Sequence, residues 1–223
     1  MPAPLRLLAE FLGTAVLVMA VVGSGLLGQA LSADLGVVIL INQLATVMIL
    51  GVLVALLMPV SGAHINPAVT LVMAIRREIS PGLAVGYVLV QLAGGVFGTV
   101  VAHVMFERQV LEFSTNDRLS LGTFVGEVVA TAGLLALILT AVYQQRSHLL
   151  PLLVPAWIGA AFFFTSSTSF ANPAVALGRM FTDSFSGIAP GSVTGFIGAQ
   201  VVGALLAIVL VLPFAQAHKK EVS

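Results

Sequence analysis

The chain lacks cysteine and carries very few charges. Without cysteine among its 223 residues, disulfides, thiolate nucleophiles and Cys-ligated metal sites are excluded. Charged residues make up only 8% of the sequence, against about a quarter in a soluble domain, while 59% are hydrophobic and the mean hydropathy is +1.11. The formal net charge of zero removes the electrostatic case for nucleic acid or acidic partners. These absences predict a polytopic membrane protein in contact with the lipid bilayer.

Long apolar segments are what the sequence has instead. A membrane-spanning helix needs about 20 apolar residues. The expected spans are Leu7–Leu31, Gly36–Met58, Leu83–Phe106, Leu121–Tyr143, Leu149–Thr165 and Ser192–Leu212. The first exceeds signal-peptide length and lacks a convincing cleavage site, so we expect it to be retained. Residues 1–223 are therefore predicted to form a single all-α membrane domain.

Two uncharged segments contain a span followed by a shorter piece. Pro59–Gly62 is expected to break the first segment and leave a short piece from Asn66 to Ile75, and a second short piece begins at Asn172. A helix of about ten residues is about 15 Å long, half the hydrocarbon thickness. Backbone that leaves helical form at membrane depth must line a cavity or be buried in protein. Two re-entrant half-helices therefore predict a water-filled path.

The two halves of the sequence resemble each other. Three segments recur: Glu10–Thr14 as Glu127–Thr131, Asn66–Val69 as Asn172–Val175, and Gly86–Gly94 as Gly195–Gly203. The predicted repeat halves cover about residues 5–110 and 119–214, and each contains three spans. An odd number of spans forces the halves to insert with opposite topology, and functional sites in such inverted repeats lie near the bilayer midplane.

Basic residues predict the orientation, because they are enriched in cytoplasmic segments. One side of the expected topology holds Arg6, Arg76, Arg77, Arg146, Lys219 and Lys220, and the other side holds Arg108, Arg118 and Arg179. We therefore expect a multi-pass protein of the inner (plasma) membrane with both termini in the cytoplasm.

Each short piece begins with the same tripeptide. Asn66-Pro67-Ala68 and Asn172-Pro173-Ala174 are strong helix starts, because asparagine caps free amides and proline suits the first helical position. A single copy would indicate capping alone. Two copies in an inverted repeat place two positive helix ends at mid-membrane, where asparagine amides can donate to a passing oxygen. The dipoles disfavour cations, including hydronium. The pair predicts a pore for neutral solutes.

These motifs resemble those of the aquaporin (major intrinsic protein) family over essentially the whole chain. The matching positions are Ala9–Thr14, Ser61–Thr70, Gln91, Glu127, Asn172–Ala174 and Gln200. The resemblance implies six transmembrane helices with two re-entrant half-helices, and a homotetramer with one pore per subunit. It also implies passive conduction of water, glycerol or other small neutral solutes, with no cofactor, metal or catalytic residue. Glu10 and Glu127 are then expected to accept hydrogen bonds from the re-entrant loops, and His64 to anchor its loop rather than gate the pore.

The selectivity filter departs from the family pattern. Most relatives carry an arginine at the position of Val175, and counting without gaps from the tripeptides puts the other filter positions at Thr46, Ala160 and Ser169. These four side chains are small and uncharged, which predicts a wide filter suited to polyols and to metalloid hydroxides such as arsenite. The pattern is similar to a bacterial subset of the family linked to arsenic resistance. A gap of one or two residues in the count would instead bring an aromatic of Phe162–Phe164 into the filter.

Arg179, one turn after Val175, is expected to be a solvated residue beside Asp183; the alternative is that it restores a positive charge near the outer mouth. The whole chain has four alternative functions. A water-selective channel with an atypical filter stays open. A secondary transporter would need ionisable groups at mid-membrane, and only Glu10 and Glu127 qualify. An adhesion protein has little loop surface here, and no nucleophile–base pair indicates an enzyme.

Overall fold

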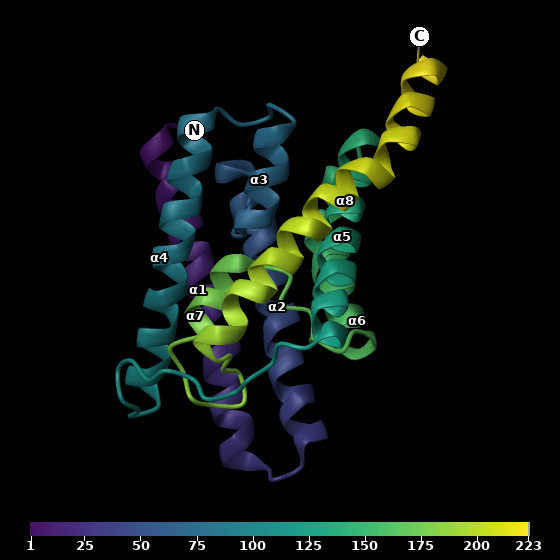
Figure 1. Ribbon diagram of the computed structural model, residues 1–223. Helices are drawn as coiled ribbons and strands as arrows, with labels where there is room; N and C mark the ends of the chain where they lie inside the picture. Colours follow the sequence, from purple (N-terminus) through teal and green to yellow (C-terminus); the bar gives the residue numbers. More distant parts are fainter. Residues whose placement is uncertain (223) are drawn as a thin grey trace.

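The computed structural model describes the backbone of residues 1–222 and the side chains of residues 1–213, and this part is helical throughout its regular structure (Figure 1). The helices are α1 (Ala3–Leu31), α2 (Leu35–Ser61), α3 (Pro67–Ile75), α4 (Pro81–Met105), α5 (Leu121–Tyr143), the 3-10 turn η1 (Ser147–Leu149), α6 (Leu150–Phe164), α7 (Pro173–Arg179) and α8 (Pro190–Val222). Six helices are long and apolar enough to cross a membrane, and α3 and α7 are short. The predicted all-α fold is confirmed. Lys219 and Lys220 lie outside the residues whose side chains are described.

The α2 helix ends later than the sequence predicts. The segment is interrupted within Pro59–Gly62, as expected, but the helix continues past the predicted last residue, Met58, through Pro59 to Ser61 and ends at Gly62. A proline in a membrane helix removes one amide donor, and surrounding protein can compensate for the loss. Gly62 stops the helix because it adopts the left-handed conformation, with φ of 91°, which glycine tolerates without a steric penalty.

The two halves of the chain form similar groups of helices with opposite directions. In the first half α1 packs against α2 and α4, and in the second half α5 packs against α6 and α8. Figure 1 shows α1 and α5 running in opposite directions, with α3 entering from the end that holds the N-terminus and α7 entering from the other. We call these the N-terminal end and the loop end; the loop end contains Asp34, which caps α2, and the segment 106–120.

Glycine lets the helices of each half approach closely. A Cβ atom on Gly94 of α4 would lie 2.5 Å from the carbonyl oxygen of Phe11 in α1, and one on Gly203 of α8 would lie 2.6 Å from that of Val128 in α5. Backbone cannot yield as a flexible side chain can, so these two crossings require the absence of a side chain.

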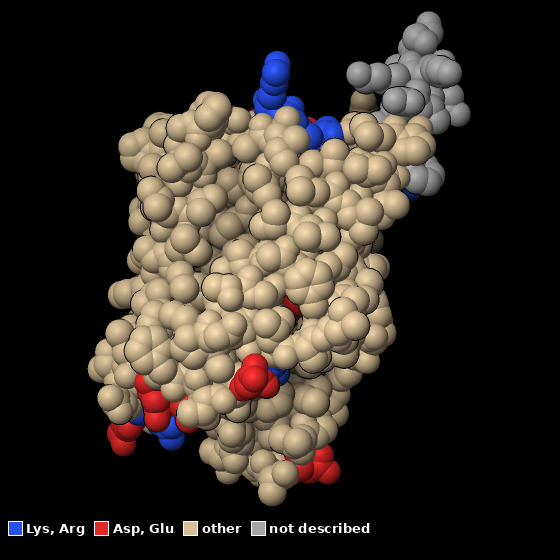
Figure 2. Space-filling view, viewed as in Figure 1, with Lys and Arg blue, Asp and Glu red and all other residues tan. Residues whose placement is uncertain are grey.

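The outer surface is apolar in its middle. Figure 2 shows most charged side chains gathered toward the two ends of the visible face, with a broad, largely uncharged belt between them that is interrupted by one small recessed acidic spot. Large apolar side chains such as Leu44 and Met48 on α2 and Leu89 on α4 are exposed. An uncharged belt of this kind fits the hydrocarbon core of a bilayer.

Candidate functional site

A cavity of about 410 Å³ runs through the interior of the helix bundle. Its lining includes Arg6 and Ser147 toward the N-terminal end, and Asn42 and Arg179 toward the loop end. Asn66 and Asn172, the first residues of the two tripeptides, both line it. The cavity therefore extends to both sides of the point where α3 and α7 meet.

The two asparagines join the halves of the molecule through reciprocal hydrogen bonds. Asn66 Oδ1 accepts from the amide of Ala68 at 2.8 Å, and its Nδ2 donates to Ala171 O at 2.8 Å. Asn172 Oδ1 accepts from the amide of Ala174 at 2.9 Å, and its Nδ2 donates to Ile65 O at 2.8 Å. Each side-chain amide nitrogen carries two hydrogens, so one hydrogen on each remains for a solute in the cavity.

Glu10 organises the first re-entrant loop from inside α1. Its Oε1 accepts from the Ser61 hydroxyl at 2.6 Å and from the His64 amide at 3.0 Å. Its Oε2 accepts from the Ile65 amide at 2.5 Å and from Gln91 Nε2 at 2.7 Å. Four donors satisfy this fully buried carboxylate, as a charged group at membrane depth requires.

Glu127 makes the equivalent set of bonds from α5. Its Oε1 accepts from the Ser167 hydroxyl at 2.7 Å and the Phe170 amide at 2.8 Å. Its Oε2 accepts from the Ala171 amide at 2.9 Å and from Gln200 Nε2 at 2.6 Å. Neither glutamate lines the cavity. The geometry gives both a supporting role for the loops, with no free carboxylate oxygen for coupled transport.

Both loops hold non-glycine residues in left-handed backbone conformations. The residues with positive φ are Ala63 and Ile65 in the first loop, and Thr168, Ser169 and Ala171 in the second. Each such residue costs about 1–3 kcal/mol and persists only where the surroundings enforce it. The hydrogen bonds from backbone amides to the two glutamates hold the loops in this conformation. The left-handed backbone in turn directs groups of the loops toward the cavity.

Stripes with a spacing of four residues form two walls of the cavity. On α2 the lining residues are Asn42, Thr46, Leu50, Val54 and Met58, and on α6 they are Leu150, Val154, Ile158 and Phe162. Residues four apart share one face of a helix. The two stripes run in opposite directions, so Phe162 lies toward the loop end, as Asn42 does.

The structure corrects the filter position on α6. Ala160 is exposed on the outside of the helix and does not line the cavity, whereas Ile158 and Phe162 are buried and do. The count without gaps failed because the strained segment between α6 and α7 does not preserve the helical phase. The i, i+4 spacing of large apolar residues in the sequence was the signal that could have identified the correct face.

The other three predicted filter residues line the same cavity. Thr46, Ser169 and Val175 are buried and come from α2, the second re-entrant loop and α7. The Thr46 hydroxyl donates to Asn42 O at 2.7 Å, and Ser169 Oγ has no hydrogen-bond partner within the described side chains. An unpartnered buried hydroxyl that faces a cavity is available to a polar solute.

His64 lies in the first re-entrant loop and lines the cavity. Its Nδ1 is 3.0 Å from the Thr70 hydroxyl, and its ring packs edge-on against Tyr87 with centroids 5.1 Å apart. Tyr87 in turn donates to Ser61 O at 2.8 Å. These contacts tie the loop to α3 and α4.

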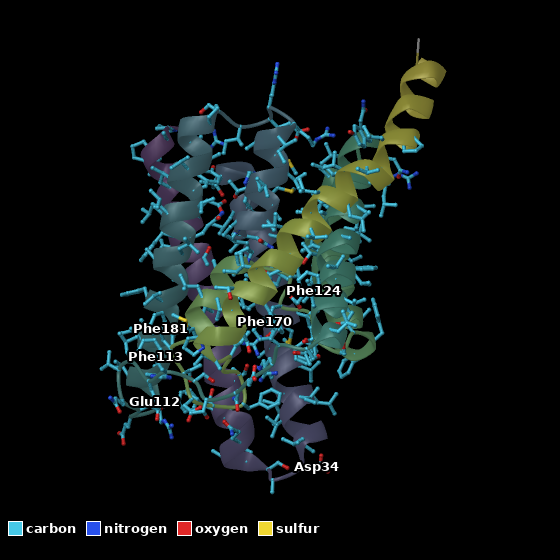
Figure 3. All side chains as sticks on the ribbon, viewed as in Figure 1. Asp34, Glu112, Phe113, Phe124, Phe170 and Phe181 are labelled. Carbon is cyan, nitrogen blue, oxygen red and sulfur yellow. The ribbon has the colours of Figure 1, made fainter. Side chains whose placement is uncertain are left out.

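The expected position of Arg179, solvated beside Asp183, is wrong. Its side chain is buried and lines the cavity, and Nε donates to Ser186 O. Asp183 instead accepts hydrogen bonds from the backbone amide and the hydroxyl of Thr115 at 2.8 and 2.9 Å. The hydrogen bond from the backbone amide lowers the pKa of this carboxyl. The guanidinium of Arg179 stacks on the ring of Phe170, which is buried and is labelled in Figure 3.

The model of the major intrinsic protein family matches residues 4–169. The chain belongs to this family. An aquaglyceroporin, AqpS, from Rhizobium meliloti (strain 1021) is 47% identical over 205 residues, which cover 92% of this chain and 88% of the relative. Aquaporin-2 from Dasypus novemcinctus is 42% identical over 97 residues, 43% of this chain and 84% of that protein.

The structure of the aquaglyceroporin from Plasmodium falciparum has a similar fold. The TM-score is 0.66 at 24% identity, and the match covers 96% of this chain and 95% of that chain. As a member of the major intrinsic protein family, the chain is a membrane channel that conducts water and small neutral solutes. The continuous interior cavity is the path that such a channel requires.

Proposed function

We propose that the chain is a passive wide-filter channel for polyols such as glycerol and metalloid hydroxides such as arsenite, as well as water. The observation that carries this proposal is Val175 in the cavity wall, where an arginine would project a long charged side chain. Thr46 and Ser169 line the same cavity, so this part of its wall has small side chains that offer hydroxyl and methyl groups. Such a lining suits solutes that present several hydroxyl groups around an apolar centre.

Selectivity in this proposal resides at the loop end, near the two asparagines. Phe162 is the aromatic residue that α6 contributes to the wall of the filter, and the small residues Thr46, Ser169 and Val175 form its other walls. One aromatic with three small residues leaves more width than two aromatics with an arginine. Solutes then pass the capping asparagines, where each side-chain amide nitrogen donates one hydrogen to a backbone carbonyl and keeps a second hydrogen to donate to the solute.

Phe162 also supports a second candidate, a channel selective for water. A large ring in the filter narrows it relative to the alanine that the sequence count suggests. Uptake of solutes of graded size separates the two candidates, since a water-selective filter would exclude glycerol.

The membrane arrangement is part of the proposal. Arg76, Arg77 and Arg146 lie on the connections at the N-terminal end, which supports a cytoplasmic N-terminus in the inner (plasma) membrane. Exposed aliphatic faces on α1 and α2, including Leu12 and Leu44, would be covered by lipid and by neighbouring copies in a homotetramer.

Stopped-flow light scattering on proteoliposomes tests the proposed selectivity, with isotope-traced arsenite uptake in parallel. We expect glycerol and arsenite to enter the wild type rapidly. Val175→Arg should reduce both fluxes by at least about tenfold while reducing water flux by less than about threefold, because it narrows the filter. Val175→Leu is the uncharged control for added bulk. Fast water entry with no glycerol entry in the wild type would establish the water-selective candidate instead.

A further inference from the structure

Two arginines, Arg118 and Arg179, lie close to the ring of Phe170 at the loop end. The guanidinium carbon of Arg179 is 3.5 Å from the centroid of the Phe170 ring, and that of Arg118 is 5.7 Å from the same centroid. Two cations gather around one buried aromatic residue, and cation–π attraction holds each of them there. Their proximity is electrostatically unfavourable, because like charges repel strongly in a low-dielectric interior, so other contacts must hold the two side chains in place.

Neither arginine has an acidic partner among the described side chains. The ion pairs of this part of the chain join Arg76 to Glu78 and Arg108 to Glu112. Arg118 donates to the carbonyl oxygens of Gly187 and Phe185, at 2.6 and 2.5 Å. These bonds to carbonyl groups orient the guanidinium groups without neutralising them.

The acids nearest in sequence are committed elsewhere. Asp117 accepts from the Ser192 hydroxyl at 2.6 Å and the Leu119 amide at 3.3 Å, and Asp183 is bound to Thr115. Glu127 accepts from its four donors and forms no ion pair with Arg179, although its carboxylate attracts the guanidinium from a distance. Arg179 therefore lines the cavity without an ion-pair partner among the described side chains.

The position of Arg179 is fixed from several elements. Its Nε bond ends on Ser186 O, and the Ser186 hydroxyl donates to Val21 O in α1 at 2.9 Å. Phe170 itself is fixed by the hydrogen bond that its backbone amide donates to Glu127 and by an edge-on contact with Phe196, with ring centroids 5.0 Å apart. A charge held this firmly at a cavity wall exerts a constant field on whatever passes.

We propose that Arg179 excludes cations at the loop end of the channel, separately from the filter width that Val175 sets one helical turn deeper. A fixed charge needs only to be near the path to repel a cation, whereas a size limit needs atoms in the path. Placing the charge on Arg179, at the wall beside Phe170, leaves the position of Val175 free for a small side chain. This inference deepens the proposed function and rests on it.

Potassium release from proteoliposomes tests this division of roles, with water and glycerol entry measured on the same preparations. We expect the wild type to release K⁺ at the rate of empty vesicles. Arg179→Gln should raise K⁺ release at least about tenfold over the wild type while glycerol entry persists, and Arg179→Lys should keep release within about twofold of it. Arg118→Gln, which alters the more distant cation, should have a smaller effect than Arg179→Gln.

A second pair of variants keeps Arg179 and its bonds in place. Val175→Glu sets a carboxylate one turn before Arg179, where an i, i+4 ion pair would neutralise the guanidinium. We expect K⁺ release to rise in Val175→Glu and to stay at the wild-type rate in Val175→Gln, which has the same size without charge. This pair decides the matter if Arg179→Gln fails to fold.

The combined variant Val175→Arg/Arg179→Gln returns the arginine to the deeper position. It should restore cation exclusion and abolish glycerol entry, because the arginine at position 175 would then both repel cations and narrow the filter. The inference is overturned if K⁺ release stays at the empty-vesicle rate in both Arg179→Gln and Val175→Glu while water passes. Failure of wild-type glycerol entry would instead count against the proposed function, and the K⁺ readout would still report on Arg179.

Discussion

The two re-entrant loops share a supporting framework and differ in what they present to the cavity. Each is held by a buried glutamate that accepts from two loop amides, a serine hydroxyl and a glutamine amide. The first loop presents His64, tied to Thr70, whereas the second presents Ser169 and Phe170, with Arg179 stacked on the latter. The two halves thus share the groups that shape the backbone and differ in the side chains that line the cavity.

Removing the glutamates should have the largest effect and should be alike in both halves. Glu10→Ala and Glu127→Ala would each leave four donors without their acceptor, and each orphaned buried group costs about 1–3 kcal/mol. That sum approaches the whole stability of a typical domain, about 5–15 kcal/mol. We expect loss of the monodisperse peak in size-exclusion chromatography for both alanine variants. A normal peak and melting temperature for one of them would break the equivalence of the loops.

The glycine crossings should give the next largest effect. Gly94→Ala and Gly203→Ala place a methyl group against backbone carbonyl oxygens at 2.5 and 2.6 Å, and overpacking of this kind costs about 1–3 kcal/mol. We expect a similar fall in melting temperature for both in detergent. Gly198→Ala is the matched control, since nothing lies within 4 Å of its added Cβ. A control that falls as far as the other two would show that the close approach is not the cause.

Phe162 should affect selectivity without affecting the framework. Phe162→Ala removes the aromatic wall, so entry of a polyol larger than glycerol, such as erythritol, should rise several-fold while the melting temperature falls by a few degrees, because a buried ring is lost. Ala160→Leu, on the outer face of the same helix, should leave both erythritol and glycerol entry unchanged. If solute entry changed in Ala160→Leu and not in Phe162→Ala, the filter residue on α6 would be Ala160, as counted from the sequence, and not Phe162.

His64 should have the smallest effect. His64→Gln retains a side chain able to bond with Thr70, so water flux should stay within about twofold of the wild type between pH 5.5 and 7.5. His64→Ala loses that bond and should lower the melting temperature slightly, by the equivalent of about 1 kcal/mol. A pH-dependent change in wild-type water flux that disappears in His64→Gln would identify a gate in place of an anchor.

Most of the fold was predictable because membrane segments are specified by composition. The span Leu121–Tyr143 was predicted with its observed ends, and the two tripeptides located the starts of α3 and α7. Local chemistry suffices there, since length, apolarity and capping act within a few residues. The end of α2 was misplaced because proline breaks helices in water more reliably than it does inside a membrane bundle.

The candidate site was less predictable where it depends on tertiary structure. Ala160 was chosen by counting across a loop, residues 165–172, whose irregular backbone shifts the helical phase, and the burial of Phe162 follows from how α6 packs. Arg179 looked like a surface residue next to Asp183 in sequence. Its burial depends on Phe170, which Glu127 holds from α5, and on the segment with Ser186 that returns to α1. No local pattern contains that information.

The reciprocal asparagine bonds impose an order on the making of the channel. Asn66 bonds to Ala171, 105 residues later, and Asn172 bonds back to Ile65 across 107 residues. While the ribosome is still completing the first half, the carbonyl oxygen of Ile65 has no donor and α3 has no partner at mid-membrane. The first half-helix, α3, therefore reaches its final position only after α7 has inserted. Neither half of the chain is expected to form a conducting pore without the other.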